Sequence, residues 1–130
     1  MLRALVLILI IGWATPGGAG HNAPPAVLTI DAGALKGLLD QGERPVSIDL
    51  RPAAEHQQGR LPGARSIPLG ELERRWAEIP RDRLVVLYCA CPEQQLTPAY
   101  YFLLRQGYRE VFVLRNGLGA WTSRGYPLEH

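Results

Sequence analysis

The chain has 130 residues, of which 47% are hydrophobic and 20% are charged, and its formal net charge is +2. A charge this small, with the basic residues scattered along the chain, gives no indication of binding to nucleic acid or to an anionic membrane surface. The only two cysteines, Cys89 and Cys91, are too few for a disulfide framework or, by themselves, for a zinc site. We therefore expect neither a metal nor a cofactor.

The first 20 residues have the pattern of a secretory signal peptide. A short positive start at Met1–Arg3 precedes an apolar run from Ala4 to about Trp13 and then a stretch of small and helix-breaking residues. We expect cleavage near Ala19 or Gly20. The apolar run is shorter than the roughly 20 residues that span a bilayer, although an uncleaved membrane anchor is the main alternative. The sequence thus predicts an exported protein, periplasmic or secreted, that contacts a membrane only if this segment is retained.

The rest of the chain is predicted to be a short linker followed by one domain. Residues 21–26 have the composition of a linker, and residues 27–130 suffice for a single domain with one hydrophobic core. Apolar, β-branched runs predict strands, whereas apolar residues at helical spacing between breakers predict helices. The predicted strands are 27–30, 46–50, 66–67, 84–88 and 111–114, and the predicted helical segments are 32–41, 53–57, 69–78, 98–106 and a short one around 120–121. This alternation predicts an α/β fold with a mainly parallel central sheet and helices on both faces.

Cys89 stands where the strongest predicted strand, Leu84–Tyr88, ends. The carboxyl ends of parallel strands are the usual place for ligand sites in open α/β sheets. Thr97 and Pro98 suggest an N-cap followed by proline at the first helical position. Backbone N–H groups and the positive end of this helix can then point at the sulfur and favour the thiolate. We therefore favour a nucleophile over an inert core cysteine, the ordinary alternative.

Several segments of the chain carry motifs: Ser47–Pro52 with Glu55, Gly59–Ala64, Tyr88–Cys89, Gln106–Tyr108, Val111–Leu114 and Gly117–Trp121. Taken together, in this order and spacing, they resemble the rhodanese family of sulfurtransferases. The resemblance implies a rhodanese-like fold over about residues 28–128. It also implies that Cys89 takes a sulfane sulfur from a small donor and holds it as a persulfide. Cys89 would then pass it to cyanide, a thiol or a partner protein. Asp49 and Arg51 would brace the structure near the active loop.

The loop after Cys89 departs from the pattern that the resemblance implies. Many family members carry arginine, glycine and serine there, whereas this loop has no cation and one carboxylate; it reads Ala90, Cys91, Pro92, Glu93, Gln94, Gln95. Pro92 lacks an N–H donor. Glu93 is expected to meet an anionic donor and to raise the pKa of the thiol, so thiosulfate is expected to be a poor donor. Arg60, Arg65 and Arg115 are candidates to supply the missing positive charge. Phosphatase chemistry is disfavoured because no arginine closes the loop.

The second cysteine leaves the mechanism open. Cys91 can be a bystander, a resolving thiol that forms a disulfide or relays sulfur, or part of a metal site shared with a partner. A Cys89–Cys91 bridge is expected to hold the two Cα atoms near the far limit of disulfide geometry. Three functions remain: a persulfide-forming sulfurtransferase, a thiol–disulfide oxidoreductase or redox sensor that uses both cysteines, and a non-catalytic binding module. The histidines carry no functional prediction.

Overall fold

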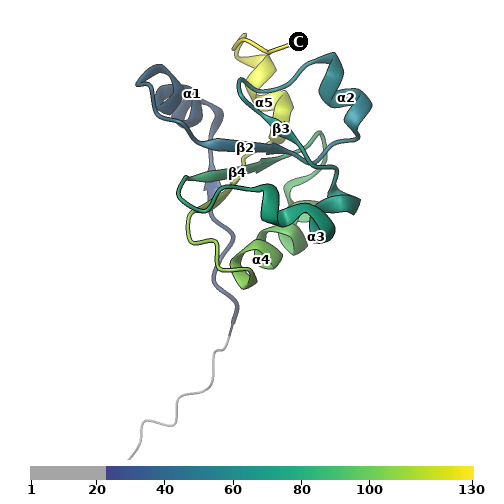
Figure 1. The fold of residues 1–130 in the computed structure, drawn as a ribbon. Coiled ribbons are helices and arrows are strands. Elements are labelled where there is room, and N and C mark those ends of the chain that lie inside the picture. The colour runs from purple at the N-terminus through teal and green to yellow at the C-terminus, as the bar shows by residue number, and fades with distance from the viewer. Residues whose placement is uncertain (1–22) are drawn as a thin grey trace, which may run out of the picture.

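A computed structural model describes residues 23–130 of the chain (Figure 1). Its centre is a sheet of five strands in the order β1-β5-β4-β2-β3, and all four neighbouring pairs are parallel. The strands are β1 (Thr29–Ile30), β2 (Val46–Asp49), β3 (Arg65–Ser66), β4 (Val85–Tyr88) and β5 (Val111–Leu114). The predicted α/β class with a parallel central sheet is confirmed.

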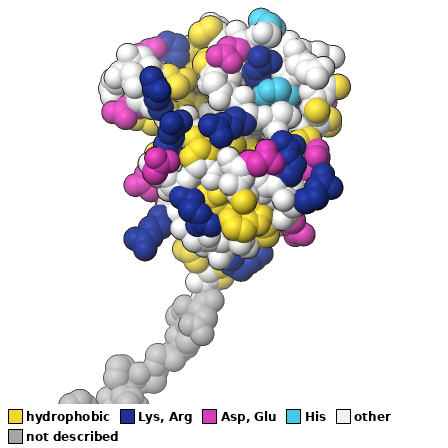
Figure 2. All heavy atoms as spheres, viewed as in Figure 1, with side chains coloured by type: hydrophobic (Ala, Val, Ile, Leu, Met, Phe, Trp, Pro, Cys, Tyr) yellow, Lys and Arg dark blue, Asp and Glu magenta, His cyan; other side chains and the backbone are white. Residues whose placement is uncertain are grey.

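Helices cover both faces of the sheet. In Figure 1, α1, α2 and α5 lie on one face, and α3 and α4 lie on the other. The α-helices are α1 (Ala32–Asp40), α2 (Ala53–Gln58), α3 (Leu72–Arg75), α4 (Thr97–Arg105) and α5 (Gly117–Ser123), and the 3₁₀ turns are η1 (Leu69–Glu71), η2 (Trp76–Glu78) and η3 (Glu93–Leu96). Acidic and basic side chains intermingle on the face shown in Figure 2, which agrees with the scattered charge of the sequence.

The central strand β4 is buried on both faces, as its continuous apolar sequence predicts. Val85, Leu87 and Cys89 belong to the core cluster that includes buried residues of α3 and α4. Val86 and Tyr88 belong to the cluster on the opposite face, with buried residues of α1 and α5. Because side chains alternate along a strand, Cys89 continues this pattern and projects toward the α4 side.

Two predicted helices differ from the structure at particular positions. The predicted helix over 69–78 is divided into η1, α3 and η2. The Tyr108 hydroxyl donates to the carbonyls of Trp76 and Ile79, at 2.9 and 2.6 Å, at the end of this segment, where the Trp76 carbonyl also accepts the Ile79 N–H in a 3₁₀ turn. The prediction that Thr97 caps α4 is wrong, because η3 runs directly into the helix, Leu96 occupies the cap position and Thr97 is already helical. Asp31 does cap α1, since its side chain accepts from the Ala34 N–H at 2.7 Å.

The predicted signal peptide, residues 1–20, and the first two residues of the predicted linker lie outside the described residues. Within residues 23–130, none of the helices combines the length and the apolar character needed to cross a membrane.

The turn after β5 packs against the end of β4. Asn116 and Gly117 both have positive φ, 59° and 60°. A Cβ atom on Gly117 would overlap the carbonyl oxygen of Cys89, and the same oxygen accepts a hydrogen bond from the Leu118 N–H at 3.1 Å. Glycine is therefore required at 117 both for its backbone conformation and for the close approach of the two chain segments.

Gly117→Ala is expected to destabilise the protein more than Gly125→Ala. Both glycines have positive φ, but a Cβ on Gly125, whose φ is 71°, meets nothing within 4 Å. The left-handed backbone alone costs about 1–2 kcal/mol for alanine, and only Gly117→Ala must also displace the Cys89 carbonyl. Urea unfolding of the two variants measures the difference, and equal losses would contradict the proposed close contact.

Candidate active site at Cys89

The backbone of Cys89 is held by two neighbouring elements. The Tyr88 carbonyl accepts from the N–H of Leu50, just after β2, at 2.9 Å, and the Cys89 carbonyl accepts from the N–H of Leu118 in α5. The side chain is buried, with 5% of the residue exposed. The strand end thus fixes the position of the sulfur before the loop begins.

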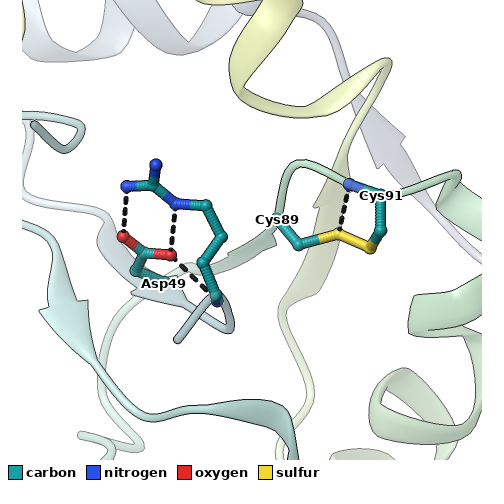
Figure 3. Close-up of a disulfide and its surroundings, with 4 residues drawn as sticks. Asp49, Cys89 and Cys91 are labelled. Atoms are coloured by element: carbon teal, nitrogen blue, oxygen red, sulfur yellow. Dashed lines mark hydrogen bonds and ion pairs between the residues drawn. A yellow bond between two sulfur atoms is a disulfide. The ribbon is translucent and has the colours of Figure 1, made fainter. Parts of the chain in front are cut away.

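Cys89 and Cys91 form a disulfide bridge (Figure 3). Their Cα atoms are 5.3 Å apart, which lies inside the usual range for disulfides. The expectation of a separation near the far limit is therefore wrong, because the backbone bends at Ala90 and Cys91 and brings the two residues together. The Cys91 N–H donates to the Sγ atom of Cys89 at 3.0 Å. Among residues 90–96, the Cys91 N–H is the one backbone N–H that donates to this sulfur, whereas the sequence analysis predicted several.

The neighbours of Cys89, and not Cys89 itself, line two surface hollows. Cys91 is partly exposed and lines an open hollow of about 380 Å³ together with Pro92, Glu93, Gln94 and Asn116. Ala90 lines a second hollow of about 320 Å³ that Arg51 also borders. In the bridged form, the sulfur that a small molecule meets first is therefore that of Cys91.

Glu93 ties the loop to the start of α5. Its Oε1 atom accepts the backbone N–H of Asn116 at 2.5 Å. Asn116 precedes the first residue of α5 and has no side-chain cap of its own, so a carboxylate from another segment lies at the positive end of this short helix. No sequence pattern indicates this contact, because the two residues are 23 positions apart.

The three arginines that were candidates to supply positive charge to the loop bind other groups. Arg60 pairs with Glu129, with 3.7 Å between Nε and Oε2, Arg65 donates to the Glu78 carbonyl and Arg115 donates to Thr29. Within residues 23–130, no lysine or arginine side chain forms a hydrogen bond or ion pair with residues 90–96. The loop is therefore without a bound cation in this part of the chain.

Asp49, at the end of β2, carries a fully buried carboxylate with several donors. Arg51 binds it through Nε at 2.9 Å, through Nη2 at 2.7 Å and through its backbone N–H at 3.0 Å. The Tyr88 hydroxyl donates to Oδ2 at 3.0 Å, and Nδ1 of His56 lies 2.9 Å from the same oxygen. The contact of His56 with Asp49 was not predicted from the sequence, because the only indication was the position of His56 in the predicted helical turn after Asp49.

The same cluster reaches the segment before β3. Nη2 of Arg51 also donates to the Gly59 carbonyl at 2.6 Å, and the Leu61 N–H donates to the Tyr88 hydroxyl at 3.2 Å. The cluster thus joins β2, β4 and the segment after α2, directly beside the residue that precedes Cys89. These contacts give a physical basis for the bracing role that the resemblance implies for Asp49 and Arg51.

Burial and hydrogen bonding act in opposite directions on the Asp49 carboxyl. Burial by itself raises its pKa, but the hydrogen bonds from Arg51 and His56 and the charge of Arg51 outweigh it and hold the pKa below its usual value. Burial, together with the negative charge of Asp49, raises the pKa of Tyr88, so its phenol stays protonated and donates. The cluster is therefore ionised at Asp49 and neutral at Tyr88.

Asp49→Asn is expected to lower the free energy of unfolding by about 3–5 kcal/mol at neutral pH, because it leaves the buried Arg51 without its counter-charge. Since the folded pKa of Asp49 lies below the unfolded value of 3.8, its contribution is fully present above that value and is lost as the pH falls through the folded pKa. The difference between the native protein and the variant should therefore shrink below about pH 4. Urea unfolding across pH measures it.

Tyr88→Phe is the matched control for this experiment. It removes one hydrogen bond to the same oxygen and should cost about 1–3 kcal/mol, while the acid loss due to Asp49 remains. A difference between the native protein and Asp49→Asn that stays constant with pH would show that Asp49 is not the titrating group.

Comparison with known proteins places this geometry in a family. The Rhodanese-like domain family matches residues 31–124. A protein named "Sulfurtransferase" from Allochromatium vinosum is 37% identical over 99 residues, which cover 76% of this chain and 92% of the relative.

Two solved structures have the same fold. The Rhodanese-like domain of the Alr3790 protein from Anabaena superposes with a TM-score of 0.69 and 29% identity, covering 80% of each chain. Thiosulfate sulfurtransferase from Pseudomonas aeruginosa superposes with a TM-score of 0.70 and 34% identity, covering 80% of this chain but only 20% of that one. From the family match and these relatives together, the chain belongs to the rhodanese-like domain family.

Proposed function

We propose that the protein is a sulfurtransferase that forms a persulfide on Cys89 and passes the sulfane sulfur to a thiol, cyanide or a protein acceptor. Family membership and the sulfurtransferase-named relatives support a role in sulfur transfer in general. The observation that carries the finer proposal is the place of Cys89 at the end of the central strand. Its carbonyl is held by α5 and its sulfur receives an N–H from the loop.

The reaction needs the bridge to be open first. A dithiol reduces Cys89–Cys91, and the Cys89 thiolate then attacks the sulfane sulfur of the donor, whose remaining part leaves with the electron pair. The Cys91 N–H, 3.0 Å from Sγ of Cys89, stabilises the negative charge on the sulfur before the attack. An acceptor nucleophile then takes the outer sulfur and returns Cys89 to the thiolate.

A persulfide or polysulfide is the donor that fits this loop better than thiosulfate. Thiosulfate carries two negative charges, whereas residues 90–96 include the carboxylate of Glu93 and no cation. Repulsion between like charges across the small hollow beside Cys91 disfavours the dianion. The sulfane end of a persulfide carries at most one negative charge, so it meets less of this repulsion.

The bridge itself favours one second candidate, a thiol–disulfide oxidoreductase that cycles Cys89 and Cys91. That function needs both cysteines and no sulfur donor, whereas sulfur transfer to cyanide uses Cys89 alone. A non-catalytic binding module, which the rhodanese fold also serves, would need neither cysteine.

An assay of the thiocyanate that the reduced full chain forms from a sulfur donor and cyanide distinguishes these functions. We expect Cys89→Ser to reduce the rate to the uncatalysed background and Cys91→Ser still to form thiocyanate, with glutathione persulfide used in preference to thiosulfate. Glu93→Gln should improve the rate with thiosulfate several-fold relative to glutathione persulfide, because it removes one like charge. Sulfur transfer that survives in Cys89→Ser would refute the proposed nucleophile.

We further propose that the protein is exported and works in the periplasm or outside the cell, with a membrane attachment only if the leader is retained. The support is the signal-like pattern of residues 1–20. Expression of the full chain in a bacterial host, followed by cell fractionation and N-terminal sequencing, should find a protein that begins near residue 20 or 21 outside the cytoplasm. Recovery of the intact chain from the cytoplasm would contradict export.

A further inference from the structure

The two bridged sulfurs differ in their surroundings. Cys89 is buried among the core residues on the α4 side of the sheet, with 5% of its surface exposed. Cys91 is partly exposed and borders the hollow formed with Pro92, Glu93, Gln94 and Asn116. Figure 3 shows the side chains of Cys89 and Cys91 turned toward one another and joined by the bridge. The pair therefore consists of an inner sulfur and an outer sulfur that can bond without rearranging the fold.

We propose that Cys91 resolves the persulfide of Cys89 and releases its sulfane sulfur as hydrosulfide, which makes the protein a dithiol-dependent sulfane-sulfur reductase. This inference rests on the proposed function, because it begins from the Cys89 persulfide. It extends that function by naming a product, hydrosulfide, and a co-substrate, a dithiol.

The resolving step balances as follows. The Cys91 thiolate attacks Sγ of the Cys89 persulfide and forms the Cys89–Cys91 bond. The bond between Sγ of Cys89 and the outer sulfur breaks, and the outer sulfur leaves with the electron pair as hydrosulfide. The sulfane sulfur is reduced by two electrons, while the two cysteines are oxidised to a disulfide. An external dithiol then reduces the disulfide and is itself oxidised.

The geometry favours attack on the inner sulfur. In the bridge, the two Cα atoms are 5.3 Å apart, so the loop already holds Sγ of Cys91 at bonding distance from Sγ of Cys89. The outer sulfur of a persulfide lies one bond farther from the Cys89 backbone, and Cys91 would have to move with the loop to take it. The bridged structure is the product of the first route and not of the second.

The same geometry directs the dithiol to Cys91. Its sulfur is the more accessible of the two, because Cys91 lines the hollow and Cys89 does not. Attack there expels Cys89 as a thiolate, and the Cys91 N–H that donates to Sγ of Cys89 at 3.0 Å stabilises this leaving group. Reduction thus regenerates the nucleophile that the next turnover uses.

The experiment is a single turnover of the full chain, reduced with a dithiol and then freed of it. Thiosulfate and glutathione persulfide are added in separate reactions, and hydrosulfide release is measured together with the intact mass after an acid quench. Thiosulfate leaves sulfite behind, so hydrosulfide is a distinct product in that reaction. Cys89→Ser gives the background release from each donor, and Cys91→Ser reports persulfide formation alone.

Cys91→Ser is expected to gain one sulfur atom and to release no hydrosulfide above the background. The native protein is expected to release one equivalent of hydrosulfide and to end two hydrogen atoms lighter, as the disulfide. A native protein that keeps the added sulfur as Cys91→Ser does would overturn the inference but leave the proposed function intact. Sulfur mapped to Cys91 would overturn it in the same way, because Cys91 would then relay sulfur.

If Cys91→Ser gains no sulfur from thiosulfate and none from glutathione persulfide, the result has a different meaning. It would overturn the proposed persulfide function, and the inference would fall with it. If Cys91→Ser does gain sulfur, a second assay uses an excess of dithiol. The native protein should then release hydrosulfide over many turnovers, and the rate of release by Cys91→Ser should be at least about ten-fold lower. Equal rates in the two proteins would overturn the inference.

Discussion

The buried charge of Asp49 constrains the parts of the structure that meet at the carboxyl ends of β2 and β4. An ionised carboxylate without access to water is tolerated only if its oxygens are fully hydrogen-bonded, and here Arg51, His56 and Tyr88 supply the donors. Since Tyr88 is the residue before Cys89, the requirement to satisfy this charge also fixes the direction in which β4 ends. The hydrogen bonds that the carboxylate at the end of β2 requires thereby help to set where the loop after Cys89 begins.

From that point the loop is held by main-chain contacts and one carboxylate. The Leu118 N–H donates to the carbonyl of Cys89, and Gly117 allows the turn before α5 to approach that carbonyl. The carboxylate of Glu93, within the loop, accepts the N–H of Asn116. Cations therefore do not organise this loop in the described part of the chain.

The sequence predicted the features that depend on local pattern. The apolar run before Cys89, its position at a strand end and the parallel α/β class all follow from periodicity and from residue type. The contacts of His56 with Asp49 and of Glu93 with Asn116 could not be predicted, since they depend on how distant segments meet. The short separation of the two cysteines was missed for a related reason, because a bend in the loop leaves no periodic signal.

The bridge has a consequence for the chemical survival of the protein in an oxidising environment. A free thiolate exposed to peroxide proceeds through sulfenic acid to sulfinic acid, and the second step is essentially irreversible. A sulfur already bonded to Cys91 carries no thiolate, and Cys89 is also shielded by the core around it. If Cys89 is the nucleophile, as proposed above, the bridged protein keeps its sulfur in a form that a dithiol can recover, and irreversible oxidation is limited to the periods in which the bridge is open.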